Sequence, residues 1–197
     1  TGDPQLGYEE FHHPEWFEPH AGLDEAGKGD LFGPLITACV IADGEMVRAW
    51  RKIGVRDSKG ISDSVVLHLE QQIKGTKGVI VKIAYCGMSR YNTLMAKPQA
   101  NLNHLLAWLH ACSLEDALKK RRVEWGMLDQ FSKQPLVQRY FKDDSFTLKM
   151  QPRAESDPVV AAASICARGE FIRQIKILSK RCGMQLRKGA GSSVKEQ

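Results

Sequence analysis

The chain has 197 residues, of which 43% are hydrophobic and 26% are charged, and its formal net charge at pH 7 is +5. This length fits one domain with a sizeable core, and no apolar run approaches the roughly 20 residues of a membrane-spanning helix. The five cysteines form neither CxxC pairs nor zinc-ligand spacing, which favours a reduced, cytoplasmic protein over a secreted one held by disulfides.

The charge is unevenly distributed along the sequence. Residues 1–20 contain five acidic side chains and no Lys or Arg, and their weak periodicity indicates an acidic tail or interdomain linker ahead of an organised domain over 21–197. The histidines of this segment are His12, His13 and His20, and all are interpreted as solvated. Residues 168–197 contain eight basic side chains. This basic body fits a polyanionic partner, although a solvated lysine-rich face would look the same.

Apolar patterning predicts alternating strands and helices from Ala21 onward. A first strand contains Asp24, and the almost continuous apolar run PLITACVIA (34–42) is typical of a strand buried on both faces. Further strands are predicted over 78–87, 124–131 and 145–151, and helices over 61–73, 101–122 and 157–183. The expected helix caps are Ser62, Asn101, Asp157 and Gly183. This order predicts an α/β fold, with helices packed on the faces of one sheet.

The stretch GLDEAGKGDLFG (22–33) has the glycine and lysine spacing of a phosphate-binding loop. Two features argue against that function: Asp24 and Glu25 would repel a nucleotide, and Gly29 stands where a hydroxyl should bind magnesium. The acids themselves are therefore the more informative residues.

Four acids stand where they could hold divalent cations. Asp24 and Glu25 lie in the first strand, Asp129 ends an apolar strand, and Glu155 precedes the last helix. Mg²⁺ prefers such carboxylate oxygens together with substrate phosphates, and two ions about 4 Å apart need several carboxylates from different elements. Neighbours on a strand point to opposite faces, so the chain is expected to end or bend between residues 24 and 27. Asp157 is interpreted as a helix cap.

Five motifs in order resemble the type 2 ribonucleases H. They are GLDEAGKGDLFGPLITACVIA (22–42), GVRDSKGIS (54–62), YNTLMAKPQANLNHLLAWLH (91–110), LDQF (128–131) and AESDPVVAAASICAR (154–168). Within that family, Lys28 in G-K-G and Glu155 as the fourth acid are similar to ribonuclease HIII. Asp157 lies two residues after Glu155, so either residue can be the fourth acid of the motif.

The resemblance implies an RNase H-like fold with a mixed five-stranded sheet flanked by helices. It also implies an endoribonuclease that uses two Mg²⁺ or Mn²⁺ ions to hydrolyse the RNA strand of RNA–DNA hybrids, leaving 5′-phosphate and 3′-hydroxyl ends. The implied catalytic and metal-binding residues are Asp24, Glu25, Asp129 and Glu155. The implied substrate-binding residues are Gly27, Lys28, Gly29, Ser58, Lys59, Asn101, Asn103 and Lys188. For Asn101 a capping role is an equal alternative, and the histidines of the helix over 101–122, His104 and His110, are interpreted as structural.

The expected partner is an RNA–DNA hybrid rather than a membrane, and the chain is expected to be a cytoplasmic monomer. Ribonucleases HIII also carry an N-terminal substrate-binding domain and a further C-terminal helix, and the sequence is expected to represent the catalytic domain without them. Two alternatives stay open: a ribonuclease HII-type activity at single ribonucleotides in DNA, and a hybrid-binding module without catalysis.

Overall fold

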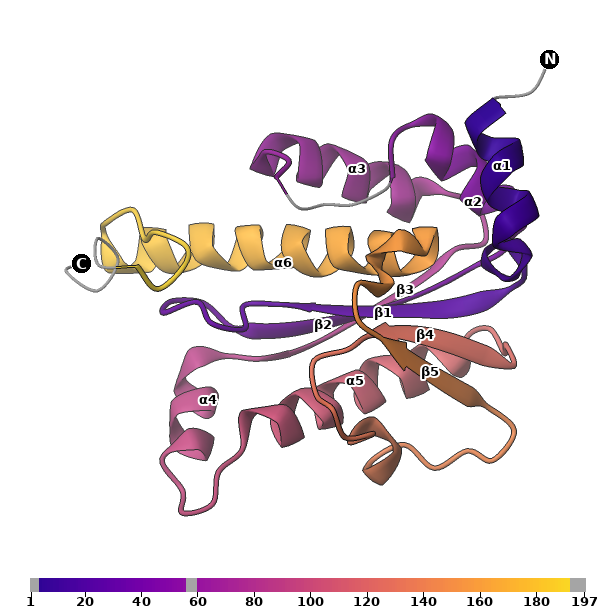
Figure 1. Cartoon of the computed structure of the whole chain (residues 1–197). Coiled ribbons are helices and arrows are strands. Elements are labelled where there is room, and N and C mark those ends of the chain that lie inside the picture. The colour runs from indigo at the N-terminus through magenta and orange to yellow at the C-terminus, as the bar shows by residue number, and fades with distance from the viewer. Residues whose placement is uncertain (1–3, 56–59, 192–197) are drawn as a thin grey trace.

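The protein is represented by a computed structural model that describes residues 4–55 and 60–191. Its centre is a five-stranded mixed sheet in the order β3-β2-β1-β4-β5 (Figure 1). The strands are β1 (His20–Ala26), β2 (Leu35–Ala42), β3 (Ile80–Cys86), β4 (Trp125–Asp129) and β5 (Thr147–Gln151). β1 runs antiparallel to β2 and parallel to β4, and β4 runs parallel to β5. The expected mixed five-stranded sheet is confirmed.

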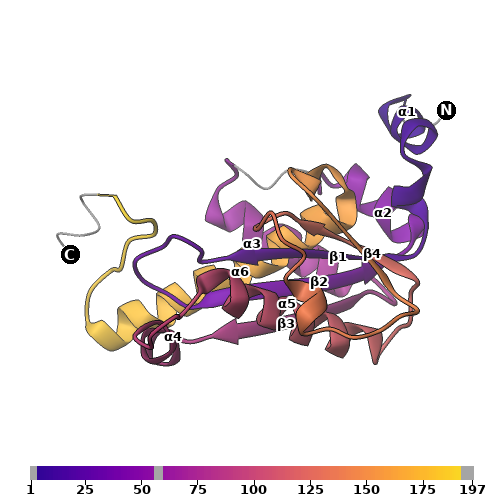
Figure 2. The ribbon, with the colours of Figure 1, turned by 60° about the horizontal axis from the view of Figure 1, so that its bottom comes forward.

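Helices cover both faces of this sheet. The α-helices are α1 (Pro4–His12), α2 (Gly44–Lys52), α3 (Asp63–Gly75), α4 (Met88–Met95), α5 (Leu102–Leu118) and α6 (Pro158–Cys182), and the 3-10 helices are η1 (Pro14–Phe17), η2 (Val137–Arg139) and η3 (Ala154–Ser156). In Figure 1, α6 lies against the upper face of the sheet, α2 and α3 lie above it on the same side, and α5 lies against the lower face. The turned view in Figure 2 shows α1 and α4 at opposite ends of the sheet.

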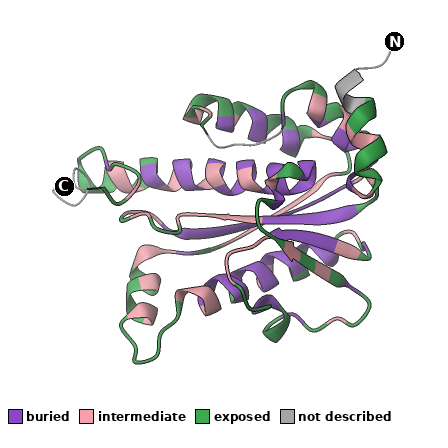
Figure 3. Ribbon diagram, in the orientation of Figure 1, coloured by how far each residue is buried: buried purple, intermediate pink, exposed green. Residues whose placement is uncertain are grey.

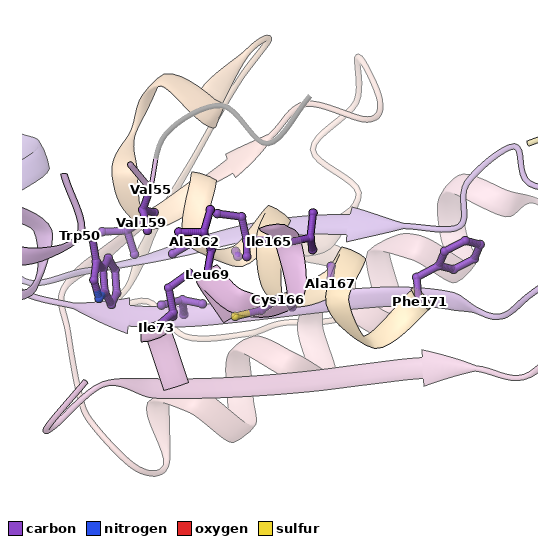
Figure 4. Close-up of a cluster of buried hydrophobic side chains, with 14 of the residues drawn as sticks. Trp50, Val55, Leu69, Ile73, Val159, Ala162, Ile165, Cys166, Ala167 and Phe171 are labelled. Carbon is purple, nitrogen blue, oxygen red and sulfur yellow. The ribbon is translucent and has the colours of Figure 1, made fainter. Parts of the chain in front are cut away.

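Buried strand residues join different hydrophobic clusters on the two faces of the sheet, because alternate residues point to opposite faces. On the α6 face, Ala38 and Val40 of β2 join the cluster that contains Val159 and Phe171 (Figure 4). On the α5 face, Leu23 joins a second cluster with residues of α5. β2 is therefore buried along its whole length, as its continuous apolar run predicts (Figure 3).

All four expected helix caps are present. Ser62, Asn101 and Asp157 each accept a backbone N–H in the first turn of their helix, and Gly183 ends α6 with φ +67°. Three short helices, α1, α2 and α4, were not predicted. Nine and eight residues are too few to give a clear periodic signal.

Residues 4–20, expected as a tail or linker, form the helices α1 and η1 and the start of β1. Glu9 and Glu10 form ion pairs with Arg51 and Arg48 of α2, and Trp16 of η1 is buried. These contacts stabilise α1 and η1 against the rest of the domain. Hydrophobic periodicity within the two short helices does not predict such long-range contacts.

The interpretation of His20 as solvated is wrong. Its side chain is fully buried at the start of β1, and Nε2 lies 3.0 Å from Oδ2 of Asp157. Nδ1 lies 2.7 Å from the carbonyl oxygen of Glu18, and the ring stacks on Trp125. The residue therefore joins β1 to the start of α6. His12 and His13 are exposed, as expected.

Gly22 brings β1 and α6 into direct backbone contact. A Cβ atom at this position would lie 2.3 Å from the carbonyl carbon of Val159 and 2.4 Å from the nitrogen of Val160. Both are backbone atoms, so no side-chain rotation relieves the overlap. The start of α6, which follows the acid Glu155, thus has its position fixed against the strand that carries Asp24.

Gly22→Ala should lower the free energy of unfolding by about 3 kcal/mol, since overpacking a rigid contact typically costs 1–3 kcal/mol. Urea unfolding followed by circular dichroism measures the change. Gly75→Ala is the matched control, because nothing lies within 4 Å of a Cβ there and the glycine belongs to helix α3. A Gly22→Ala midpoint equal to that of the wild type would contradict the contact.

None of the helices in the described part of the chain has both the length and the apolar character needed to cross a membrane.

Candidate active site

The candidate acids gather where β1 and β4 end. The two strands are parallel and pair from Ala21–Gly126 to Leu23–Leu128, so their carboxyl ends lie at the same edge. Asp129 is the last residue of β4, and Asp24 occupies the position after Leu23 in β1. Ligand sites of sheets with parallel strands commonly lie at such carboxyl ends.

Asp24 points to the α6 face of the sheet. It pairs with Ala38 of β2, whose side chain belongs to the α6-side core. The side chain makes a hydrogen bond with Ser164 of α6, and its Oδ1 accepts the backbone N–H of Glu25 at 2.8 Å. Desolvation, the negative charge of Glu25 and that of Asp129 raise the pKa of Asp24 from 3.8 to about 7, although the two hydrogen bonds act against this.

Glu25 points to the α5 face instead. It pairs with Thr37, whose hydroxyl lies 3.5 Å from Ser113 of α5, and its Oε2 lies 3.0 Å from Nε2 of His110. β1 keeps its pairing with β2 as far as Ala26. The strand thus ends one residue after Glu25, and no bend turns the two acids to the same face.

Asp129 and the segment before α6 are joined directly. Oδ1 of Asp129 accepts the backbone N–H of Ala154 at 3.0 Å. This bond holds η3, and with it Glu155, at the end of β4. The structure therefore joins Asp129 to Ala154, 25 residues later in the sequence and directly before Glu155.

Asp157, the other candidate for the fourth acid, is fully engaged in the core. Its side chain is fully buried, caps α6 through the N–H of Val159 at 2.8 Å and contacts His20. Glu155 is only partly buried. These contacts support the interpretation of Asp157 as a cap and favour Glu155 as the acid of the site.

Within residues 4–55 and 60–191, no three His, Cys, Asp or Glu side chains converge closely enough to hold one metal ion. The donor set nevertheless fits a hard divalent cation, because oxygen ligands are what Mg²⁺ prefers. Burial is the largest cause of the raised pKa of Asp24, and the negative charges of Glu25 and Asp129 raise it further. A cation beside it would offset that repulsion.

The G-K-G loop follows the acids immediately. Gly27 and Gly29 have φ values of +89° and +87°, and a Cβ on Gly27 would lie 2.2 Å from the carbonyl oxygen of Pro34. Lys28 is exposed, and its Nζ donates to the carbonyl oxygen of Phe131 at 3.2 Å. The loop is thereby attached to the segment that follows Asp129.

A hollow of about 210 Å³ opens beside this loop. Its polar lining includes Asp30, Tyr91 and Asn92. The backbone of Gly189 reaches the same region, since its N–H donates to Asp30 and its carbonyl oxygen accepts from Leu31. The residues from α4 and the C-terminal segment thus share one surface with G-K-G.

The remaining candidate substrate-binding residues are placed as follows. Asn101 is the N-cap of α5 and accepts the backbone N–H groups of Asn103 and His104, so its capping role is confirmed. Lys188 is exposed, and its Nζ lies 2.5 Å from Oδ1 of Asp63. Ser58 and Lys59 lie outside the described residues.

Two residues that contact the acids were missed as site residues. Ser164 is the first polar residue after the run Ala161–Ala163, and His110 is a polar side chain within an apolar helix. Both patterns indicate a polar side chain that is buried with its apolar neighbours. Only the register of β1 shows that Ser164 contacts Asp24 and that His110 contacts Glu25.

A protein-family model described as ribonuclease HII matches residues 21–197. The chain belongs to this family. It is 37% identical to ribonuclease HIII of Protochlamydia amoebophila over 191 residues, and 41% identical to ribonuclease HIII of Chlamydia pneumoniae over 182 residues. These matches cover 94% and 90% of this chain but 62% and 60% of the relatives. The chain therefore spans about three fifths of the length of these ribonucleases HIII.

Solved structures of ribonucleases HIII have the same fold. A crystal structure of Bst-RNase HIII in complex with Mn²⁺ is 30% identical with a TM-score of 0.81, covering 91% of this chain and 60% of that one. The structure of Aquifex aeolicus RNase H3 is 27% identical with a TM-score of 0.77, covering 98% of this chain and 71% of that one. The family resemblance inferred from the five motifs, and the RNase H-like fold, are confirmed.

Proposed function

We propose that this domain is a ribonuclease H that hydrolyses the RNA strand of RNA–DNA hybrids with two divalent cations. Asp24, Glu25, Asp129 and Glu155 are the proposed ligands, with Mg²⁺ or Mn²⁺ as the ions. The observation that carries the proposal is the Asp24 carboxyl group, which lies near the ends of two parallel strands where the charges of Glu25 and Asp129 act on it. The Mn²⁺ complex of Bst-RNase HIII supports the use of a divalent metal by a relative.

Cations bound at these carboxylates would activate a water molecule and stabilise the leaving 3′ oxygen, which gives 5′-phosphate and 3′-hydroxyl ends. The chain's own residues have to orient the carboxylates. Ser164 and the N–H of Glu25 orient Asp24, and the N–H of Ala154 orients Asp129. Each of these donors is held by a strand or helix, so the acids are positioned before substrate arrives.

The surface beside the acids suits a nucleic-acid backbone. Gly27 and Gly29 carry no side chains, so their amides can approach the 2′-hydroxyl groups that distinguish RNA from DNA. Lys28 is the proposed phosphate contact and would exchange the Phe131 carbonyl oxygen for a phosphate oxygen. Asn103, Ser58, Lys59 and Lys188 stay proposed backbone contacts, and Lys188 would have to leave Asp63 first.

The test is a cleavage assay on two substrates, a long RNA–DNA hybrid and a DNA duplex with one ribonucleotide, each with Mg²⁺ and with Mn²⁺. Cleavage of the hybrid alone supports the ribonuclease HIII type. Efficient cleavage of both substrates favours the ribonuclease HII type. No cleavage of either, together with calorimetry that detects no Mg²⁺ or Mn²⁺ binding, would establish a non-catalytic hybrid-binding module and overturn the proposal.

Lys28→Ala should weaken hybrid binding and reduce its salt dependence, because one phosphate contact contributes about one unit to the slope of log K against log salt. Fluorescence anisotropy with a labelled hybrid at several salt concentrations measures the slope. Lys77→Ala is the matched control: Lys77 is exposed and precedes β3, at the opposite end of the sheet from Gly27. An unchanged slope in Lys28→Ala would count against the phosphate contact.

A further inference from the structure

His110 is a fully buried polar side chain in the apolar helix α5. Its Nε2 lies 3.0 Å from Oε2 of Glu25, and its Nδ1 is buried and makes no hydrogen bond with any described residue. A neutral imidazole has one N–H, and the carboxylate can only accept, so the proton belongs on Nε2. Both the burial and the unsatisfied Nδ1 cost free energy that a leucine at this position would not.

The register of β1 indicates why a buried histidine is needed at position 110. Asp24 points toward α6 and Glu25 toward α5, so Ser164, which bonds Asp24, lies on the other side of the sheet from Glu25. The glutamate side chain has three rotatable bonds and lies one residue before the end of its strand. Without a partner on the α5 face it would sample many rotamers.

The ring of His110 is itself held in place. It stacks on Phe131, with centroids 5.4 Å apart and ring planes 16° from parallel. The carbonyl oxygen of Phe131 accepts Nζ of Lys28, and Phe131 follows the catalytic candidate Asp129 by two residues. The segment after β4 therefore fixes the imidazole plane from the side of the candidate site.

From these contacts we propose that His110 is a positioning residue for Glu25. It binds Oε2 and fixes the carboxylate at the end of β1, which leaves Oε1 to face a cation. The inference rests on the proposed function in that Glu25 is taken as a metal ligand. His110 touches neither substrate nor reacting atoms, and it acts only through Glu25.

The experiment compares His110→Gln with His110→Leu. An amide at the end of the glutamine side chain can still donate to Glu25, whereas leucine keeps the packing and removes the bond. His104→Gln is the matched control, since His104 lies on the same helix and bonds the hydroxyl of Tyr140 at 2.9 Å instead of an acid. Mn²⁺ binding to the protein alone is measured by calorimetry, and kcat and KM are measured on a hybrid.

His110→Leu should weaken Mn²⁺ binding by about 10–100-fold, as loss of a residue that orients a metal ligand typically does. It should lower kcat and leave KM for the hybrid unchanged, because only the orientation of a ligand is lost. His110→Gln should recover most of both losses, and His104→Gln should match the wild type. If His110 had a purely structural role, His110→Leu would instead lower the thermal midpoint. It would not lower kcat at unchanged KM, and His110→Gln would not restore the losses.

Wild-type Mn²⁺ affinity and kcat in a folded His110→Leu variant would overturn the inference. If the leucine variant does not fold, His110→Asn replaces it, since the shorter side chain stays polar but does not reach Glu25. Failure of the proposed function is seen separately. In that case wild-type protein cleaves no hybrid and binds no Mn²⁺, which overturns both proposals. Failure of the inference alone leaves wild-type cleavage and Mn²⁺ binding intact and shows no difference between the wild type and the His110 variants.

Discussion

Asp24→Asn should reduce hybrid cleavage by at least ~10³-fold and leave hybrid binding within a few-fold of the wild type. A cation at this site supplies several kcal/mol of transition-state stabilisation, and each ~1.4 kcal/mol is a factor of ten in rate. The amide loses the charge but keeps an oxygen that can still accept from Ser164 and the N–H of Glu25. The fold and the G-K-G surface are therefore expected to stay intact.

Single-turnover cleavage measures the rate, and fluorescence anisotropy without metal measures binding. Asp116→Asn makes the same chemical change at an exposed acid of α5 that pairs with Lys119, and it should cleave like the wild type. Metal-dependent cleavage at a wild-type rate in Asp24→Asn would remove Asp24 from the catalytic centre.

The same substitution should make the metal-free protein more stable at high pH. The pKa of Asp24 is about 7 in the folded protein and has an ordinary value of 3.8. The folded state thus holds a proton that the unfolded state has released, so stability falls as pH rises from about 4 to about 7 and then levels off. At ~1.4 kcal/mol per pKa unit, the full penalty is about 4 kcal/mol at pH 8.

Urea unfolding in the presence of a chelator at pH 5 and pH 8 tests this effect. The difference in unfolding free energy between Asp24→Asn and the wild type should be larger at pH 8, and added Mn²⁺ should reduce it. Comparing the two proteins at each pH removes the contribution of other titrating groups. An equal difference at both pH values would mean that Asp24 is not the strained carboxyl group.

The main elements were predictable because their signals are local. The apolar run of β2 and the capped helices α3, α5 and α6 each have a sequence pattern that the structure reproduces. The helices α2 and α4 were missed because they are short, and α1 because its ion pairs with α2 are long-range contacts. His20 was misread for the same reason, since its partner Asp157 lies 137 residues away.

The acids of the site were predictable from their positions at strand ends, but their orientations were not. Sequence shows that Asp24 and Glu25 are neighbours, and only the pairing with Ala38 and Thr37 shows that they point to opposite faces. The partners Ser164 and His110 come from helices on the two faces, so no spacing in the sequence links them to the acids.

The division of Asp24 and Glu25 between the faces of the sheet gives each side chain its own partner helix, α6 for Asp24 and α5 for Glu25. A small shift of α6 moves Ser164 and the groups around Asp24, whereas the same shift of α5 moves His110 and Glu25. Changes in either hydrophobic core, far from any substrate, can retune one acid at a time.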